Sequence, residues 1–501
     1  AAVRITGNVG QGVLLDRPPA DASTTDTDED DDGIEDSAEG TAVLTSSGSA
    51  PALDIGSERD TTLGAVGTGV DAFGLLNRGN IIASGVNDGV SATAIRIGQA
   101  GGGSTTVVGG IGNQAGTITA TAYGAEATAI LVNPGAVVVS LRNAGVIAAA
   151  QTGGQNNAGA VIDESGSLGL VENTGTIQAT ITAVAGQAVT GRAIALDLSA
   201  NTTGATVRQA KANADGKPAI AGDVLLGSGD DRVELLGGTL RGALSFGTGA
   251  DTLVIDGAAD AQGALTDTDG RLAVSVGQGR LAISNLEVVN LSSLSLGAKS
   301  VLGITIDPAN QAATRLHVSG AATVASGAEI DISLASLVKT ATSFEVIRAG
   351  SLEMGAAGAN LAGSPFLYTA ALRTDANALL VDIRPKTAAE LGLNRSGAQA
   401  YSAVFAALDK DAKIETAFLS QTTKQGFQAL YDQMLPDHSG GALMSAAAIS
   451  GAISQAVGQP LPHDGRGGTG VWAQEILFQV ERDPDQAQGY QTHGFGLAAG
   501  A

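Results

Sequence analysis

The segment between Asp26 and Glu39 carries the residue types best suited to metal binding, because nine of its fourteen positions are acidic. Its pattern is D-x-D-x-D-G-I-x-D-x-x-E, with Gly33 at the place of a sharp bend. A hard Ca²⁺ ion takes about six to eight oxygen ligands, and loops with this spacing supply them. We therefore predict a Ca²⁺ site here, with a solvated acidic linker as the alternative. The expected ligands are the side chains of Asp28, Asp30, Asp32, Asp36 and Glu39 and the backbone carbonyl of Ile34.

This acidic loop resembles the calcium loops of EF-hands. Because Ile34 directly follows Gly33, it is more similar still to the calcium loops of thrombospondin type 3 repeats. No helical pattern flanks the segment, so we do not expect a complete EF-hand. Glu29, Asp31 and Glu35 lie between the ligand positions and are expected to face solvent.

A second pattern, Gly-x-Gly-x-Asp followed by alternating apolar residues, occurs twice between residues 224 and 257. The copies begin at Gly227 and Gly247 and are offset by 20 residues at every position. The glycines predict a tight turn and the alternation predicts a strand, so the repeat predicts a parallel β-helix with stacked rungs. Asp231 and Asp251 should then lie in neighbouring rungs. We interpret them as structural turn carboxylates, with shared cation binding as the alternative.

A different repeat, Asn-x-Gly-x-Ile, marks further rungs between residues 41 and 210. It begins at Asn77, Asn143 and Asn173, with a weaker copy at Gly116 and Ile118. The unequal spacing predicts rungs with insertions on one face. We interpret the asparagines as corner residues that bond the backbone rather than as ligand contacts.

The composition fits a narrow stacked core and argues against several classes of protein. Glycine supplies 71 of the 501 residues and aromatic residues only 3%. The absence of cysteine excludes disulfides and thiolate metal sites. A net charge of −23 opposes nucleic acid and anionic lipid as partners. Neither a signal peptide nor an apolar run of 18 residues is evident, so we expect a chain that is cytosolic or already processed.

We expect an all-β chain with four segments. Residues 1–271 are predicted to form the β-helix that carries the acidic loop at 26–39, and residues 272–385 a strand-dense continuation of it. Residues 386–470 are predicted to form a short α-helical linker, and residues 471–501 two strands with the alternation of a membrane barrel.

The linker has its own signals. Pro385 ends the strands, and the capping-box pair Thr387 and Glu390 predicts the start of a helix. A second helix, rich in small residues, is expected from about Gly441 to Val457. It would fit inside a narrow pore, with an ordinary buried helix as the alternative.

Three features together resemble a known family. They are the Gly-x-Gly-x-Asp turns, the strand Arg-Leu-His-Val-Ser-Gly-Ala-Ala-Thr-Val at 315–324, and the strand pair that ends near residue 385. In this combination they look like the passenger domain of a bacterial autotransporter, which belongs to type V secretion. Segment 272–385 then resembles its folding-nucleation (autochaperone) region. Val471, Trp472 and Ala473 resemble the start of its translocator β-barrel.

The resemblance implies a right-handed β-helix displayed outside the bacterial cell, at the outer membrane. The implied partners are the outer membrane, through the rest of the barrel, and the outer-membrane assembly machinery. Two strands cannot close a barrel, so the barrel fragment is expected to be truncated and unable to insert alone.

No residue pattern indicates an enzyme. His317 is the only histidine of the predicted β-helix, and no Gly-x-Ser-x-Gly, His-Glu-x-x-His or phosphate-loop motif accompanies it. We predict a non-enzymatic adhesin or a self-associating surface or filament protein, stabilised by Ca²⁺. Its receptor, on a host surface or a glycan, cannot be deduced from the sequence.

The alternative function is a polysaccharide-cleaving β-helix. Its acids would be Asp231 with Glu234, or Asp251 with Asp256, since glycoside cleavage needs two carboxyl groups beside the sugar. The scarcity of aromatic residues that would stack on sugars argues against it.

Overall fold

In the computed structural model, the described residues are 1–17, 25–28, 34–355, 360–362, 365–435, 440–458, 471–483 and 489–500. They belong to two compact units. The first comprises Ala1–Ser333, Ser343–Ala362 and Leu372–Val381, and the second comprises Leu334–Thr342, Gly363–Ala371 and Asp382–Ala501. The segment boundaries expected after residues 271, 385 and 470 stay predictions.

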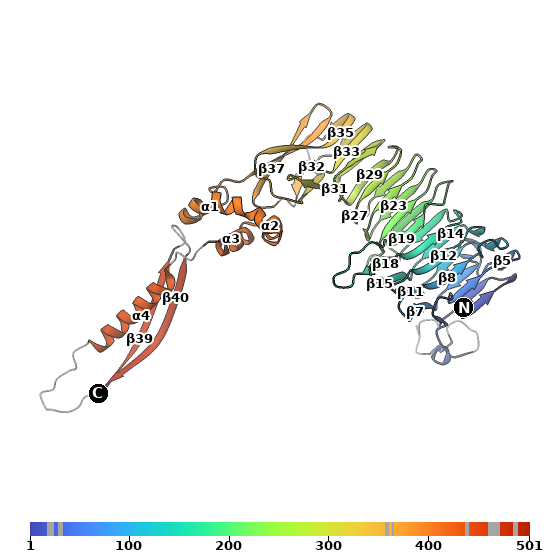
Figure 1. The fold of residues 1–501 in the computed structure, drawn as a ribbon, viewed down its shortest axis with the longest axis horizontal. Helices are drawn as coiled ribbons and strands as arrows, with labels where there is room; N and C mark the ends of the chain where they lie inside the picture. The colour runs from blue at the N-terminus through green and yellow to red at the C-terminus, as the bar shows by residue number, and fades with distance from the viewer. Residues whose placement is uncertain are drawn as a thin grey trace. The chain divides into compact units, whose positions relative to one another are not determined.

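The first unit is a parallel, solenoid-like stack of short strands (Figure 1). Three columns of strands make up its sides, and each strand pairs in parallel with the strand one coil further along the chain. The first column is β1 (Val3–Ile5), β4 (Leu53–Ile55), β8 (Ala92–Ile97), β12 (Ala127–Val132), β16 (Ala158–Asp163), β19 (Ala193–Leu198), β22 (Asp223–Leu226), β25 (Leu244–Phe246) and β28 (Leu265–Asp267).

The other two columns belong to one large sheet. One contains β2 (Val13–Leu15), β6 (Leu75–Asn77), β10 (Ile111–Asn113), β14 (Ser140–Asn143), β17 (Leu170–Asn173), β20 (Thr206–Ala210), β23 (Arg232–Leu236) and β26 (Thr252–Ile255). The other contains β3 (Val43–Ser47), β7 (Asn80–Gly85), β11 (Thr117–Tyr123), β15 (Val146–Thr152), β18 (Thr176–Thr182), β21 (Ala219–Ala221), β24 (Thr239–Arg241) and β27 (Ala259–Gly263). Both continue into β29 (Ala273–Ile283). A small separate sheet holds β5 (Thr61–Leu63), β9 (Thr105–Val107) and β13 (Ala136–Val138).

The strands after β29 extend the large sheet. They are β30 (Val288–Leu291), β31 (Ser293–Asp307), β32 (Ala312–Ala313), β33 (Arg315–Val324), β34 (Glu329–Leu334), β35 (Thr342–Met354), β36 (Asn360–Ala362), β37 (Tyr368–Asp375) and β38 (Ala378–Pro385). His317 lies on β33 with an exposed side chain, and its Nδ1 is 3.3 Å from Oδ1 of Asn290.

The predicted alternation explains the core of the solenoid. Strand β15 alternates buried and half-buried residues, and Ile147 and Ala149 face inward. The isoleucines of the Asn-x-Gly-x-Ile repeat stack in register, since Ile81, Ile118, Ile147 and Ile177 pair in successive strands and each is fully buried. Each such side chain contributes about 1.5–3 kcal/mol relative to exposure, so the column stabilises rungs that cannot fold singly.

The second unit contains the helical region predicted after Pro385. Its helices are α1 (Arg395–Ala407), α2 (Ala412–Leu419), α3 (Lys424–Gln433) and α4 (Gly441–Val457). The helix expected from Gly441 to Val457 is confirmed as α4, whereas its fit inside a pore stays a prediction. The start expected at Thr387 is wrong: Thr387 and Glu390 do bond reciprocally, but in a turn, and α1 begins at Arg395 behind the N-cap Asn394.

Phenylalanine and tyrosine rings form the core of these helices. Phe427 lies 5.6 Å from Tyr431 and 5.8 Å from Phe418, measured between ring centroids. The unit also contains the expected strand pair, in which β39 (Trp472–Arg482) runs antiparallel to β40 (Tyr490–Gly500). Among the described residues, no helix combines the length and apolar character needed to cross a membrane.

Candidate functional site

The acidic loop is only partly described. Asp28, Ile34, Asp36 and Glu39 lie within the described residues, whereas Asp30 and Asp32 lie outside them. The N–H of Asp36 donates to the carbonyl of Thr27 at 2.9 Å, and a short 3₁₀ turn follows at Asp36–Ala38. Within the described part of the chain, no three acidic or histidine side chains are grouped to hold a metal ion. The Ca²⁺ site, which includes the two undescribed aspartates, therefore stays a prediction.

The asparagines of the second repeat form a continuous ladder of side-chain hydrogen bonds inside the solenoid. We call Asn77, Asn113, Asn143, Asn173 and Gln209 the amide ladder. Each side-chain NH₂ donates to the carbonyl oxygen of the next side chain, at 2.8, 2.7, 2.8 and 2.9 Å in chain order. All five residues are at most 2% exposed.

The same amides also bond the backbone of their own corners. Nδ2 of Asn143 donates to the carbonyl of Gly145 at 3.2 Å, and Nδ2 of Asn173 donates to that of Gly175 at 3.2 Å. This agrees with the interpretation of the asparagines as corner residues. The contacts between rungs, and the inclusion of Gln209, were not predicted, because both depend on which rungs lie side by side.

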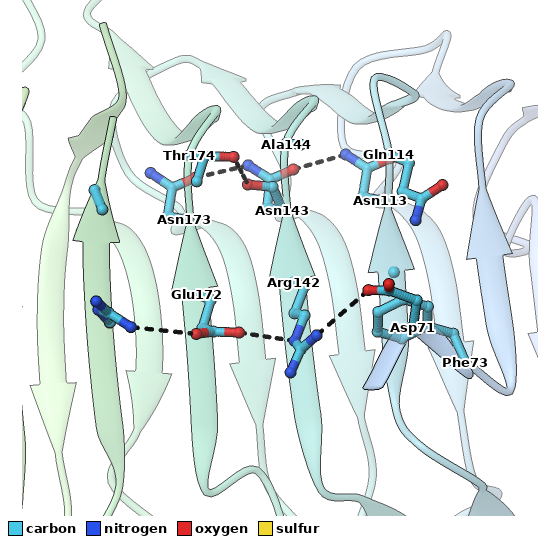
Figure 2. Close-up of a pocket in the computed structure, with 13 residues that line it drawn as sticks. Asp71, Phe73, Asn113, Gln114, Arg142, Asn143, Ala144, Glu172, Asn173 and Thr174 are labelled. Atoms are coloured by element: carbon cyan, nitrogen blue, oxygen red, sulfur yellow. Dashed lines mark hydrogen bonds and ion pairs between the residues drawn. The ribbon is translucent and has the colours of Figure 1, made fainter. Parts of the chain in front are cut away.

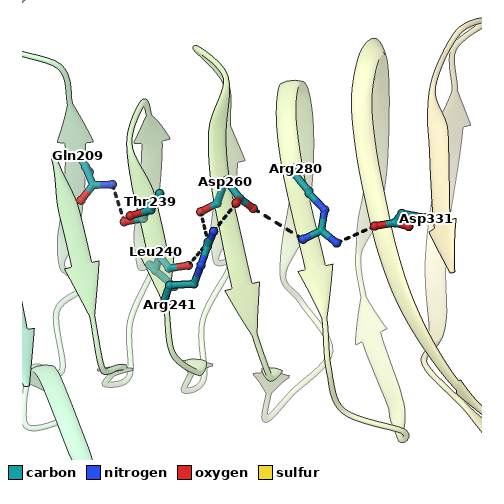
Figure 3. A network of polar contacts seen from close by, with 7 residues as sticks. All are labelled: Gln209, Thr239, Leu240, Arg241, Asp260, Arg280 and Asp331. Atoms are coloured by element: carbon teal, nitrogen blue, oxygen red, sulfur yellow. Dashed lines mark hydrogen bonds and ion pairs between the residues drawn. The ribbon is translucent and has the colours of Figure 1, made fainter. Parts of the chain in front are cut away.

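On the outer face of β14, β17, β20 and β23, charged side chains alternate in sign from rung to rung, and Asp71, in the turn before β6, pairs with the first of them. We call Asp71, Arg142, Glu172, Arg208 and Glu234 the charge ladder. Arg142 lies 2.7 Å from Glu172 and 3.6 Å from Asp71, and Arg208 lies 3.9 Å from Glu172 and 3.5 Å from Glu234. A second such series, Arg241, Asp260, Arg280 and Asp331, follows on later rungs (Figure 3).

A groove of about 360 Å³ lies between the charge ladder and the turn residues of the same rungs (Figure 2). Gln114, Ala144 and Thr174 line one side of it, and Arg142 and Glu172 line the other. Phe73 lies at one end of the groove, and its ring packs against the backbone of Gly112. A larger residue could not occupy position 112, because its Cβ would lie 2.7 Å from the Phe73 ring. The ring itself is only 2% exposed, so it offers a ligand little stacking surface.

The two Gly-x-Gly-x-Asp copies stack as predicted, with Val233 paired to Leu253 and Leu235 to Ile255. The glycines are required by close approach, since a Cβ at Gly247 would lie 1.6 Å from the carbonyl oxygen of Gly227. The corner gathers five acidic side chains, which we call the carboxylate corner: Asp230, Asp231, Asp251, Asp267 and Asp269.

Asp231 and Asp251 are each 1% exposed at the centre of this corner. Oδ1 of Asp231 accepts from the N–H of Ala205 at 2.7 Å, and Oδ1 of Asp251 accepts from the N–H of Asp231 at 2.8 Å. Their Oδ2 atoms and Oδ1 of Asp267 are buried without a hydrogen-bond partner. Burial, with the like charges of Asp251 and Asp230 adding to it, raises the pKa of Asp231 to about 6 despite the Ala205 bond.

The carboxyl pairs considered for polysaccharide cleavage have separate surroundings. Asp231 is buried at the start of β23, whereas Glu234 faces outward between Arg208 and Arg232. Asp251 is buried before β26, whereas Asp256 follows that strand and accepts from the N–H groups of Gly257 and Gln278.

Comparison with protein-family profiles found no match, and comparison with curated proteins found no similar protein.

Proposed function

We propose that this chain is a surface-displayed passenger of the autotransporter class that acts as a non-enzymatic adhesin. The observation that carries this proposal is the groove between the charge ladder and the turn residues, on one face of a long parallel stack. A right-handed parallel β-helix is the form we propose for that stack, because crossovers between parallel strands are overwhelmingly right-handed. The helices and the final strand pair are proposed to be the linker and the first strands of a translocator barrel.

The shape and polarity of the groove favour an oligosaccharide as the ligand. Its lining runs from Gly112 to Arg208 across four neighbouring strands, which at the usual strand spacing is about 14 Å. Arg142, Glu172 and Gln114 offer hydrogen-bond donors and acceptors in alternation along it. A peptide that bound by adding a strand would need a free edge, but β14 is paired on both sides.

The test is binding of the purified chain to an immobilised panel of neutral and acidic oligosaccharides, followed by calorimetry with those that bind. Replacing both Arg142 and Arg208 with Ala should weaken oligosaccharide binding about tenfold or more, since each substitution removes a charged hydrogen-bond donor from the groove. The matched control replaces Arg192 and Arg241 with Ala. These also form surface ion pairs, with Asp223 and Asp260, but do not line the groove.

Three other results would contradict the proposal. Equal loss of binding in both variants would place the ligand elsewhere. Absence of any oligosaccharide binding, together with concentration-dependent assembly in light scattering, would favour the self-associating surface protein. Release of reducing ends from a polysaccharide would favour the enzyme.

The proposed role of Ca²⁺ is to order the acidic loop. In calorimetry, Glu39→Gln should abolish Ca²⁺ binding, because the last position of such a loop supplies a bidentate carboxylate. Glu35→Gln is the matched control: it removes the same charge from an exposed position between the expected ligands. Identical titrations of the wild type and both variants would refute this site.

A further inference from the structure

The carboxylate corner contains buried negative charge that the protein does not neutralise. Among the described residues, the ion pairs include none of its five aspartates, and the adjacent Arg232 turns outward to Glu234. The preceding corner, Asn201–Ala205, contributes no titratable side chain. Asp267 and Asp269, from the following rung, add like charges beside Asp251.

Hydrogen bonds reach only some of the carboxylate oxygens of this corner. Each central carboxylate accepts one backbone N–H through Oδ1, and the second oxygen has no partner. Asp267 repeats the arrangement, since Oδ2 accepts from the N–H of Leu272 at 3.1 Å while Oδ1 is buried and unpartnered. A buried carboxylate with an unpartnered oxygen is costly unless it takes up a proton or a cation.

The arrangement favours a proton over a metal ion. A metal ion needs several converging oxygen ligands, and no three acidic side chains in the described part of the chain are grouped in that way. A proton needs only one carboxylate oxygen. It removes the charge and supplies an O–H donor where the acceptors are in excess.

We propose that the carboxylate corner is a proton-binding site, which takes up a proton in mildly acidic solution and so tightens the rungs between Gly227 and Leu272. Its centre is the pair Asp231 and Asp251, and its surrounding acidic groups are Asp230, Asp267 and Asp269. The proposal is independent of what the groove binds.

The direction of the effect follows from proton linkage. The pKa of Asp231 is about 6 in the folded chain, whereas the pKa of an unfolded aspartate is about 3.9. Between about pH 3.9 and pH 6 the folded corner therefore binds more protons than the unfolded chain does. Its stability is highest in acid and falls as the pH rises through about 6. The rungs should be tight at about pH 5 and looser at about pH 7.5.

Hydrogen exchange measured by mass spectrometry on the full chain tests this site. Peptides covering residues 224–257 should be about tenfold or more better protected at pH 5 than at pH 7.5, after correction for intrinsic exchange rates. The double variant Asp231→Asn with Asp251→Asn should show the high protection at both pH values. An Asn amide is neutral like the protonated acid, and its oxygen still accepts the backbone N–H.

The matched control is Asp163→Asn. Asp163 is also buried at a corner, but both of its oxygens accept hydrogen bonds, from Ser165 and Leu168. This variant should keep the pH dependence at 224–257 unchanged. Should the double variant fail to fold, Asp231→Asn alone is compared with the wild type, because it removes the carboxyl whose pKa is raised to about 6.

Three outcomes would overturn the proposal. One is equal protection of the wild type at both pH values, and another is a pH dependence that persists in the Asn variant. The third is protection at pH 7.5 that millimolar Ca²⁺ restores in the wild type but not in the variant, since this would identify a metal site instead.

Discussion

The amide ladder and the carboxylate corner both stack polar side chains in columns at the corners of successive rungs. They differ in how well the buried polar atoms of the column are supplied with hydrogen-bond partners. In the amide ladder every member is buried and every NH₂ group meets a carbonyl oxygen, from Asn77 to Gln209. In the carboxylate corner Asp231 and Asp251 are equally buried, yet one oxygen of each has no partner.

The difference follows from the chemistry of the two groups. An amide carries both donors and an acceptor, so neighbouring amides in a column satisfy one another, and within this ladder only Oδ1 of the first member, Asn77, is without a partner. A carboxylate only accepts, so stacked carboxylates depend on backbone N–H groups and repel one another. A β-solenoid can thus extend an amide column through its interior, whereas a carboxylate column needs a proton or a cation from outside.

The largest expected effect breaks the stacking of the carboxylate corner itself. Gly247→Ala would place a Cβ 1.6 Å from the carbonyl oxygen of Gly227, so the two rungs must separate. We expect a loss of about 4 kcal/mol or more in the free energy of unfolding, or a chain that does not fold. Denaturant unfolding followed by circular dichroism measures this. Gly40→Ala, whose Cβ would meet nothing within 4 Å, should change stability by less than about 0.5 kcal/mol.

The next effect converts the amide ladder into a carboxylate column. Asn143→Asp removes the NH₂ group that donates to Asn173, Gly145 and Thr176, and places a charge at a position 2% exposed. We expect a loss of about 3 kcal/mol at neutral pH, and a smaller one in acid, where the carboxyl is protonated. The same unfolding experiment applies. A loss equal to that of Asn87→Asp, at an exposed turn, would contradict the role of the ladder.

The reverse conversion should stabilise the protein. With both Asp231 and Asp251 replaced by Asn, we expect the melting temperature at pH 7.5 to rise by about 2–4 °C, because buried charge is removed. The difference from the wild type should shrink as the pH falls below about 6, where Asp231 takes up a proton in the folded chain. It should disappear only below about pH 4, where the aspartates of the unfolded chain are protonated as well. Calorimetric melting over this pH range is the measurement, and a variant that melts lower at pH 7.5 would refute the expectation.

The smallest expected effect distinguishes the contribution of the charge ladder to stability from that of the amide ladder. Glu172→Gln removes the contacts to Arg142 and Arg208, all partly exposed, and should cost less than about 1 kcal/mol. The cost should fall further at high salt, which screens surface ion pairs. Unfolding at low and high salt checks this against Glu164→Gln at an exposed position. A cost as large as that of Asn143→Asp would mean that the outer charges, not the amides, hold these rungs together.

Sequence patterns predicted the rungs well where the repeat is short and regular. The 20-residue offset between Gly227 and Gly247 predicted the pairing of Val233 with Leu253, because equal lengths bring equal positions together. The helix start was predicted less well. Thr387 and Glu390 do cap one another, but the chain makes only a turn there before Asn394 caps α1.

The sequence by itself determined the local states of this chain. Alternating apolar residues specify strands, and the isoleucines of the Asn-x-Gly-x-Ile repeat specify an inward face. Glycines such as Gly247 specify where neighbouring backbones touch. Each of these depends on residues that are close together along the chain.

Only the tertiary structure decided which polar groups meet. Asn173 donates to Gln209 across 36 residues. The repeat placed Asp231 and Asp251 in neighbouring rungs, but only the structure shows that the N–H of Asp231 donates to Oδ1 of Asp251 while both Oδ2 atoms have no partner. The unequal spacing of the repeats shows that rungs carry insertions, but it does not specify where in a coil each insertion lies or which residues then meet across neighbouring rungs. Whether a buried oxygen finds a donor depends on that register. The amide column, in which only Oδ1 of Asn77 has no partner, and the carboxylates, each with one unpartnered oxygen, therefore became distinguishable only once the rungs were stacked.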